Sequence, residues 1–249
     1  MMSLDSVLLI IAGAFAGGFA NGLAGFGTGL FALGWWLVAV PPVEAVITVV
    51  IMSVIGGAQG LYAVRKFINF SEQARFLIPA IFGIFTGYFF LTNINVIILK
   101  FMVAGLLVLF GGFFTFRKNL PKLKRKYLLI DITVGFMSGA FGMIAGMSGV
   151  ILTMGCSMYD WNKAQRRSLV QPFNIIVLGT VFLVMMSKGF LASYPWIIVA
   201  IALPFSIFGT QTGIYVFRRL DDHQFQRLLI WLIFLSGLVL AGREITFGI

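Results

Sequence analysis

Long runs of apolar residues, separated by short polar loops, make up almost the whole chain of 249 residues, of which 60% are hydrophobic and 10% charged. The pattern predicts eight hydrophobic segments, most of them with the length of one membrane helix, about 20 residues. They span about 6–40, 44–64, 74–92, 94–116, 127–159, 165–187, 192–217 and 223–242. No soluble domain has this composition. We therefore expect an all-α polytopic membrane protein.

Two of these segments, 6–40 and 127–159, are too long for one straight crossing. As continuous helices they would reach about 50 Å, whereas the hydrocarbon core of a bilayer is about 30 Å thick. Glycines interrupt both segments, in Asn21-Gly-Leu-Ala-Gly-Phe-Gly-Thr-Gly29 and in Gly142-Met-Ile-Ala-Gly-Met-Ser-Gly149. Broken hydrophobic segments at corresponding places in two halves are the best sequence pointer to a transporter's binding site.

The order of the segments repeats, because one long, broken segment is followed by three ordinary ones, twice over. A shift of 121 residues without a gap places Gly18 on Gly139 and Gly25 on Gly146. We expect each half to consist of a re-entrant or broken helical hairpin followed by three membrane helices. The expected division is a first repeat at 1–118, a basic cytoplasmic linker at 119–126 and a second repeat at 127–249.

The distribution of charge sets the expected orientation. The net charge is +10, and the basic residues gather in loops near 65–75, 117–126, 163–167 and 218–227. If all eight segments crossed, two of these clusters would lie outside, against the positive-inside rule. If both long segments enter and leave on one side, all four clusters are cytoplasmic and the halves have inverted topology. Such loops contact lipid headgroups, so no nucleic-acid partner is expected.

The expected hairpin tips offer a binding site for an anion. A helix that begins inside the membrane presents N–H groups and the positive end of its dipole, and glycines allow close approach. The alternative is that the glycines only let helices pack closely. The candidate residues are Asn21, Gly25, Phe26, Gly27 and Thr28 in the first segment and Gly146, Met147, Ser148 and Gly149 in the second.

Two amides follow the second long segment. Gln171 and Asn174 lie three residues apart in the expected helix 165–187, so they share a face. An amide in lipid is costly without a partner, so these side chains either line the pocket or form hydrogen bonds between helices. Arg166 and Arg167 open the same helix, and we interpret them as topology anchors in preference to an anion-recruiting pair.

Other function classes lack the residues they need. Cys156 is the only cysteine and His223 the only histidine, and the chain has no Walker motif or Ser/His/Asp set, so we expect neither an enzyme nor a metal or other cofactor. No acidic residue falls clearly within a membrane segment, which disfavours proton relays and cation transport. An anion leaving a cell with a negative interior gains about 2.3 kcal/mol per charge per 100 mV, which suits export.

The sequence resembles the TauE/SafE family of sulfite and organosulfonate exporters over essentially the whole chain. The resemblance rests on the Gly-rich segments 17–29 and 135–149, and on Lys163-Ala-Gln-Arg-Arg-Ser-Leu-Val-Gln-Pro-Phe-Asn174. It implies a multi-pass permease of the bacterial plasma membrane that moves sulfite, sulfonates or related small anions, and it allows a homodimer. Carried onto this chain, the binding residues are those of both tips, with Gln171 and Asn174.

We therefore expect an anion transporter that works by alternating access, with export favoured. An anion channel with the same pore and a permease for a small carboxylate are the alternatives. A membrane partner that transports nothing would use the same glycines for packing alone. A cation transporter is disfavoured by the missing carboxylates.

Overall fold

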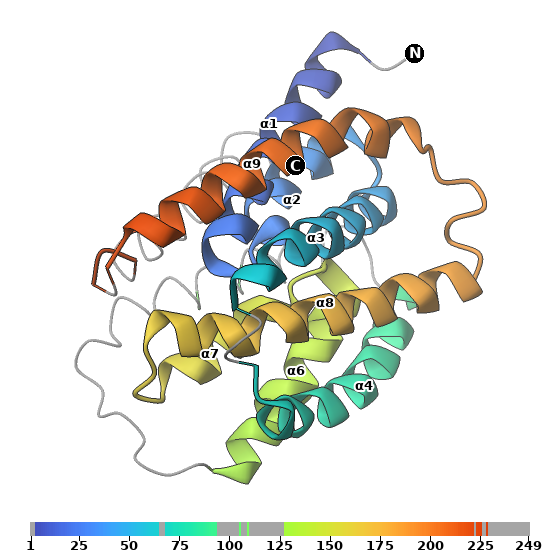
Figure 1. The fold of residues 1–249 in the computed structure, drawn as a ribbon. Coiled ribbons are helices and arrows are strands. Elements are labelled where there is room, and N and C mark those ends of the chain that lie inside the picture. Colours follow the sequence, from blue (N-terminus) through green and yellow to red (C-terminus); the bar gives the residue numbers. More distant parts are fainter. Residues whose placement is uncertain are drawn as a thin grey trace.

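The computed structural model describes residues 3–64, 68–93 and 127–221, together with Gly105, Leu109, 223–225 and Leu228. Short loops join the helices of these ranges (Figure 1). The helices are α1 (Leu4–Ala24), α2 (Thr28–Ala39), α3 (Pro42–Val64), α4 (Phe70–Asn93), α6 (Leu128–Ala145), α7 (Ser148–Ser157), α8 (Lys163–Ser187) and α9 (Ile197–Arg219). The expected linker at 119–126 and nearly all of the segments 94–116 and 223–242 lie outside the described residues.

Six helices of the described ranges are long and apolar enough to cross a membrane, namely α1, α3, α4, α6, α8 and α9. Together with the two short apolar helices α2 and α7, they confirm the expected all-α polytopic membrane protein. The last of the six begins later than expected, at Ile197 instead of about residue 192. The chain turns first at Gly189, whose φ is 79°, and Pro195 then precedes the helix.

The first overlong segment breaks at the expected glycines. Helix α1 ends at Ala24, and Gly25 follows in the left-handed conformation with φ 82°, which a residue without Cβ adopts at little cost. Helix α2 then returns antiparallel to α1. Near the open end of the pair, Trp36 Nε1 donates a hydrogen bond of 3.1 Å to the carbonyl oxygen of Ile10. Near the break, a methyl group added at Gly17 would lie 3.2 Å from Thr28 Cγ2.

The second overlong segment has the same form. Helix α6 ends before Gly146, whose φ is 66°, and helix α7 returns along it. At the open end, the Tyr159 hydroxyl donates a hydrogen bond of 2.9 Å to Asp131 Oδ1. At the break, a methyl group at Gly142 would lie 3.1 Å from Ser148 Cβ. Each overlong segment is therefore an antiparallel pair of shorter helices.

Small residues set the packing of two further helix pairs. Helix α1 packs along α9, and α4 packs along α6. Each of the four helices contributes two glycines spaced four residues apart, and a Cβ at any of them would meet backbone or Cβ atoms of the partner helix, as small-xxx-small contacts between membrane helices require. These glycines are Gly18 and Gly22, Gly209 and Gly213, Gly83 and Gly87, and Gly135 and Gly139.

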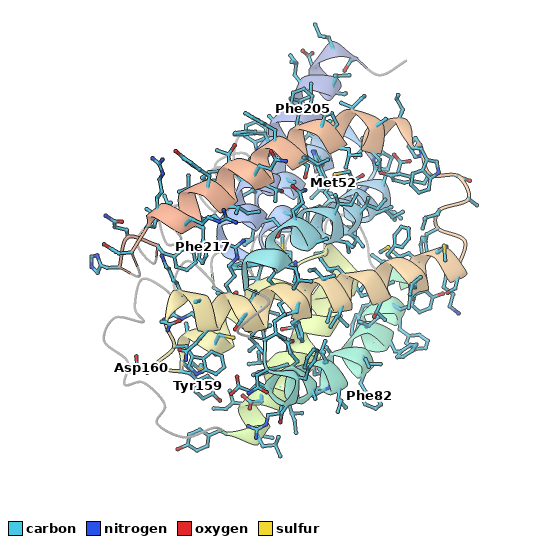
Figure 2. The ribbon with its side chains drawn as sticks, viewed as in Figure 1. Met52, Phe82, Tyr159, Asp160, Phe205 and Phe217 are labelled. Carbon is cyan, nitrogen blue, oxygen red and sulfur yellow. The ribbon has the colours of Figure 1, made fainter. Side chains whose placement is uncertain are left out.

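Helices α3 and α8 pack against each other through the middle of the molecule, with α1, α2 and α9 on one side and α4, α6 and α7 on the other (Figure 1). Large apolar side chains point outward from the outer helices. Phe82 of α4 and Phe205 of α9, labelled in Figure 2, are 65% and 38% exposed. Such a surface suits contact with lipid, while the polar side chains described next lie in the interior.

Candidate functional site at the two helix breaks

The two breaks lie against each other in the interior. We call residues 25–28 the first tip and residues 146–149 the second tip. A methyl group added at Gly29, one residue past the first tip, would lie 3.1 Å from the carbonyl oxygen of Ala145 and 3.1 Å from Met147 Cγ. One added at Gly149 would overlap Phe26. Phe26 and Met147 are buried. Residues of the two tips therefore contact each other.

A helix begins at each tip without a side-chain cap. The N-cap of α2 is Gly27, with φ 108°, and the N-cap of α7 is Met147. Neither residue forms a side-chain hydrogen bond to the first turn of its helix. The positive ends of two helix dipoles therefore lie where the tips meet, which is favourable for an anion.

The first tip is tied to α1 and α3 by Asn21. Its Nδ2 donates hydrogen bonds of 3.1 Å to Thr28 Oγ1 and 3.1 Å to the carbonyl oxygen of Ser53. A carbonyl oxygen only accepts, so the atom facing it must be the amide nitrogen. The other amide atom, Oδ1, is buried without a hydrogen-bond partner, as is Thr210 Oγ1. Both residues lie against Gly56 of α3, where side-chain bulk would displace them.

The second tip is tied to α8. Ser148 Oγ donates a hydrogen bond of 2.5 Å to Asn174 Oδ1, and both side chains are buried. A methyl group at Gly149 would also lie 3.3 Å from Asn174 Oδ1. Asn174 thus contacts the second tip at two successive residues.

Helix α8 also contacts the first tip, through Gln171. A methyl group at Gly25 would lie 3.1 Å from Gln171 Cβ and 3.4 Å from Arg167 Cγ. The Gln171 side chain is buried, and its Nε2 donates a hydrogen bond of 2.6 Å to the carbonyl oxygen of Gly57 in α3. Both amides of α8 therefore form hydrogen bonds between elements and also contact a tip, so the two interpretations of the sequence describe the same residues.

Arg167 is the residue that the sequence interpretation misassigned. A topology anchor at the membrane surface would be exposed, but Arg167 is 1% exposed. Its Nε donates a hydrogen bond of 2.8 Å to Gln171 Oε1, and its Nη1 lies 3.5 Å from the carbonyl oxygen of Leu23. The guanidinium stacks 4.1 Å from the ring centre of Phe217, which is labelled in Figure 2. Nη2 is buried without a hydrogen-bond partner.

The spacing of α8 carries the signal that could have revealed this. Arg167, Gln171 and Asn174 follow one another at intervals of four and three residues, so they lie on one helix face. Arg166 precedes that face and is partly exposed. Because Gln171 and Asn174 were already candidates for the pocket, Arg167 belonged with them by periodicity.

The second tip has an apolar neighbour in the corresponding place. A methyl group at Gly146 would lie 2.5 Å from Val49 Cγ1 and 3.8 Å from Val50 Cγ2, both on α3. Val46, one turn earlier on α3, is also fully buried. The first tip therefore packs against an amide and a guanidinium, whereas the second packs against valines.

The family model described as sulfite exporter TauE/SafE matches residues 9–240, nearly the whole chain. This chain belongs to the TauE/SafE family. Membership indicates a multi-pass membrane transporter, not an enzyme, and a substrate that is sulfite or a related small anion. No curated protein and no solved structure matches the chain.

In this TauE/SafE protein the residues predicted for the site form one contact network. Asn21 bonds to Thr28, and Gly25 packs on Gln171. Phe26 packs on Gly149, and Gly149 lies next to Asn174, which accepts a hydrogen bond from Ser148. Residues that the sequence interpretation did not place in the site also join the network. They are Ser53, Gly56, Gly57, Gly60, Arg167, Thr210 and Phe217.

Proposed function

We propose that this protein exports small sulfur-containing oxyanions, such as sulfite or organosulfonates, by alternating access across a bacterial plasma membrane. The observation that carries the proposal is the meeting of two buried, uncapped helix N-termini inside a TauE/SafE chain. Backbone N–H groups and helix dipoles attract an anion with a strength that still allows its release. A carrier needs this balance, because the anion must also leave.

The proposed architecture has two inverted repeats, at 1–118 and 127–249. The helix pairs α1–α2 and α6–α7 are the re-entrant hairpins of this plan, one entering from each side, with all basic loops in the cytoplasm. Two contacts support the plan, since α1 of the first half packs along α9 of the second, and α6 of the second packs along α4 of the first. Non-helical backbone at membrane depth is tolerated when it is buried in protein, as both tips are. A homodimer stays a prediction.

In the proposed mechanism the anion lies between the two tips. The N–H groups of Gly25, Gly146 and Met147 donate to carbonyl oxygens of the preceding helices. The first tip would therefore supply the N–H groups of Gly27 and Thr28, and the second those of Ser148 and Gly149, with the hydroxyls of Thr28 and Ser148 beside them. Asn21, Gln171 and Asn174 hold the tips through their side chains. Rocking one hairpin with its attached helices relative to the other would open the site to one side at a time.

Anion flux into proteoliposomes under an imposed membrane potential tests this proposal. Sulfite, thiosulfate, sulfate, methanesulfonate and acetate are compared, with and without a pH gradient. We expect saturable flux of a sulfur oxyanion that follows the potential and is stimulated by counter-flow. Linear, much faster flux would identify a channel instead, and flux of acetate alone would identify a carboxylate permease. Absence of flux for all five anions would overturn the proposal.

Substitutions at the tips test the site itself. Gly25→Val and Gly146→Val place a β-branched side chain at φ values of 82° and 66°, where it is strained by about 1–2 kcal/mol. The added atoms would also press on Gln171 of α8 and on Val49 of α3, and so displace the tips. We expect both variants to insert into the membrane and to lose transport. Gly179→Ala in α8 is the matched control and should transport normally, because no described residue outside the backbone of α8 lies within 4 Å of the added methyl group. Normal flux in both valine variants would contradict the site assignment.

A further inference from the structure

We infer that Arg167 binds the negative charge of the transported anion, and that it makes the first tip selective for a singly charged oxyanion. This inference rests on the proposed function. It assigns the charge selectivity of the site to one side chain, which the sequence pattern had placed among the surface anchors.

Within the described ranges, no carboxylate forms an ion pair with Arg167. Among the residues that the structure describes, its hydrogen-bond acceptors are the amide oxygen of Gln171 and the carbonyl oxygen of Leu23, and both are neutral. Phe217 offers the face of its ring, which is also neutral. A buried charge without an opposite charge is strongly destabilising, and proteins keep such groups in membranes mainly for function. An anionic ligand supplies the missing charge.

The guanidinium also has hydrogen-bond donors without an acceptor among the described residues. In the described part of the chain two acceptors face its five N–H groups, and Nη2 is buried without a hydrogen-bond partner. Gly60 of α3 lies beside that atom, and a methyl group added there would be 2.8 Å from Nη2 and would overlap Gln171 Nε2. A purely structural arginine at the carbonyl end of α1 would use these donors or leave them in water. Here the bare backbone of Gly60 keeps the donor side of the guanidinium unobstructed by any side chain at that position.

The position of Arg167 connects it to the tip. Its alkyl chain is next to Gly25, and its Nε bonds to the same Gln171 that packs on Gly25. Gln171 acts as a positioning residue, because its Nε2 is fixed on the carbonyl oxygen of Gly57 while its Oε1 holds the guanidinium. An anion bound by the first tip therefore lies close to a charge held in one orientation.

The chemistry of the guanidinium defines the class of anion. Its planar fork binds two oxygens of one group, as a sulfonate, hydrogensulfite or carboxylate presents them. Lys163 also lies over the Phe217 ring, but it is only partly buried and its ammonium donates to the carbonyl oxygens of Phe217 and Leu220. The buried positive charge of Arg167 balances a single negative charge, and the described neighbours of Gly146 in the second tip are valines. A doubly charged anion would leave one charge uncompensated in the interior. Methanesulfonate should bind well, and sulfate, which has a similar shape and two charges, should bind poorly.

The experiment compares wild type, Arg167→Met, Arg167→Lys and Arg219→Met in detergent and in proteoliposomes. Arg219 is an exposed arginine at the end of α9, stacked on Tyr215, so its substitution removes the same charge outside the site. Binding of methanesulfonate, sulfate and chloride is followed by calorimetry and by the shift in Tm, and flux is measured for the same anions.

We expect wild type and Arg219→Met to bind methanesulfonate more tightly than sulfate or chloride, and to gain thermal stability from it. Arg167→Met should lose at least about 30-fold in affinity for methanesulfonate, the range found when one partner of a buried charge pair is removed. Without anion, Arg167→Met should have a higher Tm than wild type, because an unbalanced buried charge is gone. A merely structural arginine would give the opposite change in Tm. Arg167→Lys keeps the charge and should retain weaker, still monovalent-selective binding.

The failures of the two proposals are distinguishable. If wild type neither binds nor transports any of the anions, the proposed function fails. If wild type binds and transports methanesulfonate and Arg167→Met does so equally well, only the role of Arg167 fails. Tighter binding of sulfate than of methanesulfonate by wild type contradicts the selectivity for a single charge, and this result needs no variant. If Arg167→Met does not fold, the Arg167→Lys and wild-type measurements still decide the inference.

Discussion

The two tips share a backbone geometry but differ in their chemical surroundings. Each follows a helix that ends at a left-handed glycine, Gly25 or Gly146, and each begins a short helix without a side-chain cap. The first tip packs on Gln171 and Arg167 of α8. The second packs on valines of α3. The shift of 121 residues that aligns the two glycines also places Gln171 on Val50 and Arg167 on Val46.

This difference shows that a helix break is not by itself an anion site of fixed strength. Two breaks of the same form supply similar N–H groups, yet among the described residues a buried cation lies beside the first and valines lie beside the second. In the proposed mechanism the neighbouring helix therefore decides the charge of the site. In the proposed mechanism the first tip holds the anion, while the second completes the pocket and separates from it during transport.

Making the first tip resemble the second should have the largest effect on transport. Gln171→Val copies the chemistry of Val50 and removes the acceptor for Arg167 Nε and the donor for the Gly57 carbonyl oxygen. The substitution leaves the Arg167 guanidinium and the Gly57 carbonyl group without these partners in the interior. We expect flux at low substrate concentration to fall by about 10- to 100-fold. The measurement is the initial rate of methanesulfonate uptake against concentration. Val50→Ala at the second tip is the matched variant, and an equal loss there would remove the distinction between the tips.

The polar links that hold the two tips should differ in their contribution to stability. Asn21→Leu removes two hydrogen bonds from the first tip, to Thr28 and Ser53, whereas Asn174→Leu removes the hydrogen bond with Ser148 at the second. Each change should lower the free energy of unfolding by about 1–3 kcal/mol, with the larger value for Asn21→Leu. Thermal unfolding in detergent measures both. A larger loss for Asn174→Leu would show that the second tip is the more firmly tied.

A small change at the back of the first tip should weaken transport without unfolding the protein. The atoms nearest to a methyl group at Gly60 belong to the side-chain ends of Gln171 and Arg167 and not to backbone, so Gly60→Ala should displace both head groups and leave the helices in place. If this displacement weakens anion binding by about 1 kcal/mol, the affinity falls about fivefold. Methanesulfonate binding by calorimetry, with Tm as the control, measures this. Unchanged binding would place the anion away from the guanidinium.

The smallest effect is expected away from both tips, on the same helix that carries Arg167. Gly179→Ala adds a methyl group that has no described residue outside the backbone of α8 within 4 Å, so we expect packing to be unaffected. Alanine in a helix interior is favoured over glycine by about 0.5–1 kcal/mol, so Tm should rise slightly and flux should stay at the wild-type value. A marked loss of flux in this variant would mean that α8 moves as a whole, and that its contacts at the tips do not act locally.

The sequence predicted the local features of the fold well. Hydrophobic length set the spans of α1, α3, α4, α6 and α8 to within a few residues, because a membrane helix requires a nearly fixed number of apolar residues. The breaks at Gly25 and Gly146 were predictable as well, since overlong segments must turn and glycine adopts the left-handed conformation. The tip residues followed directly from these breaks.

What the sequence by itself determined is therefore the set of helices, their two interruptions and the family of transporters to which the chain belongs. Only the tertiary structure decided that the tips meet, that α8 lies behind the first and α3 behind the second, and that Arg167 is buried. The physical reason is the range of the interactions. Helix spans and turns depend on neighbours in the chain, whereas the burial of Arg167 depends on residues far from it in sequence. Leu23 and Gly60 precede it by more than a hundred residues, and Phe217 follows it by about fifty.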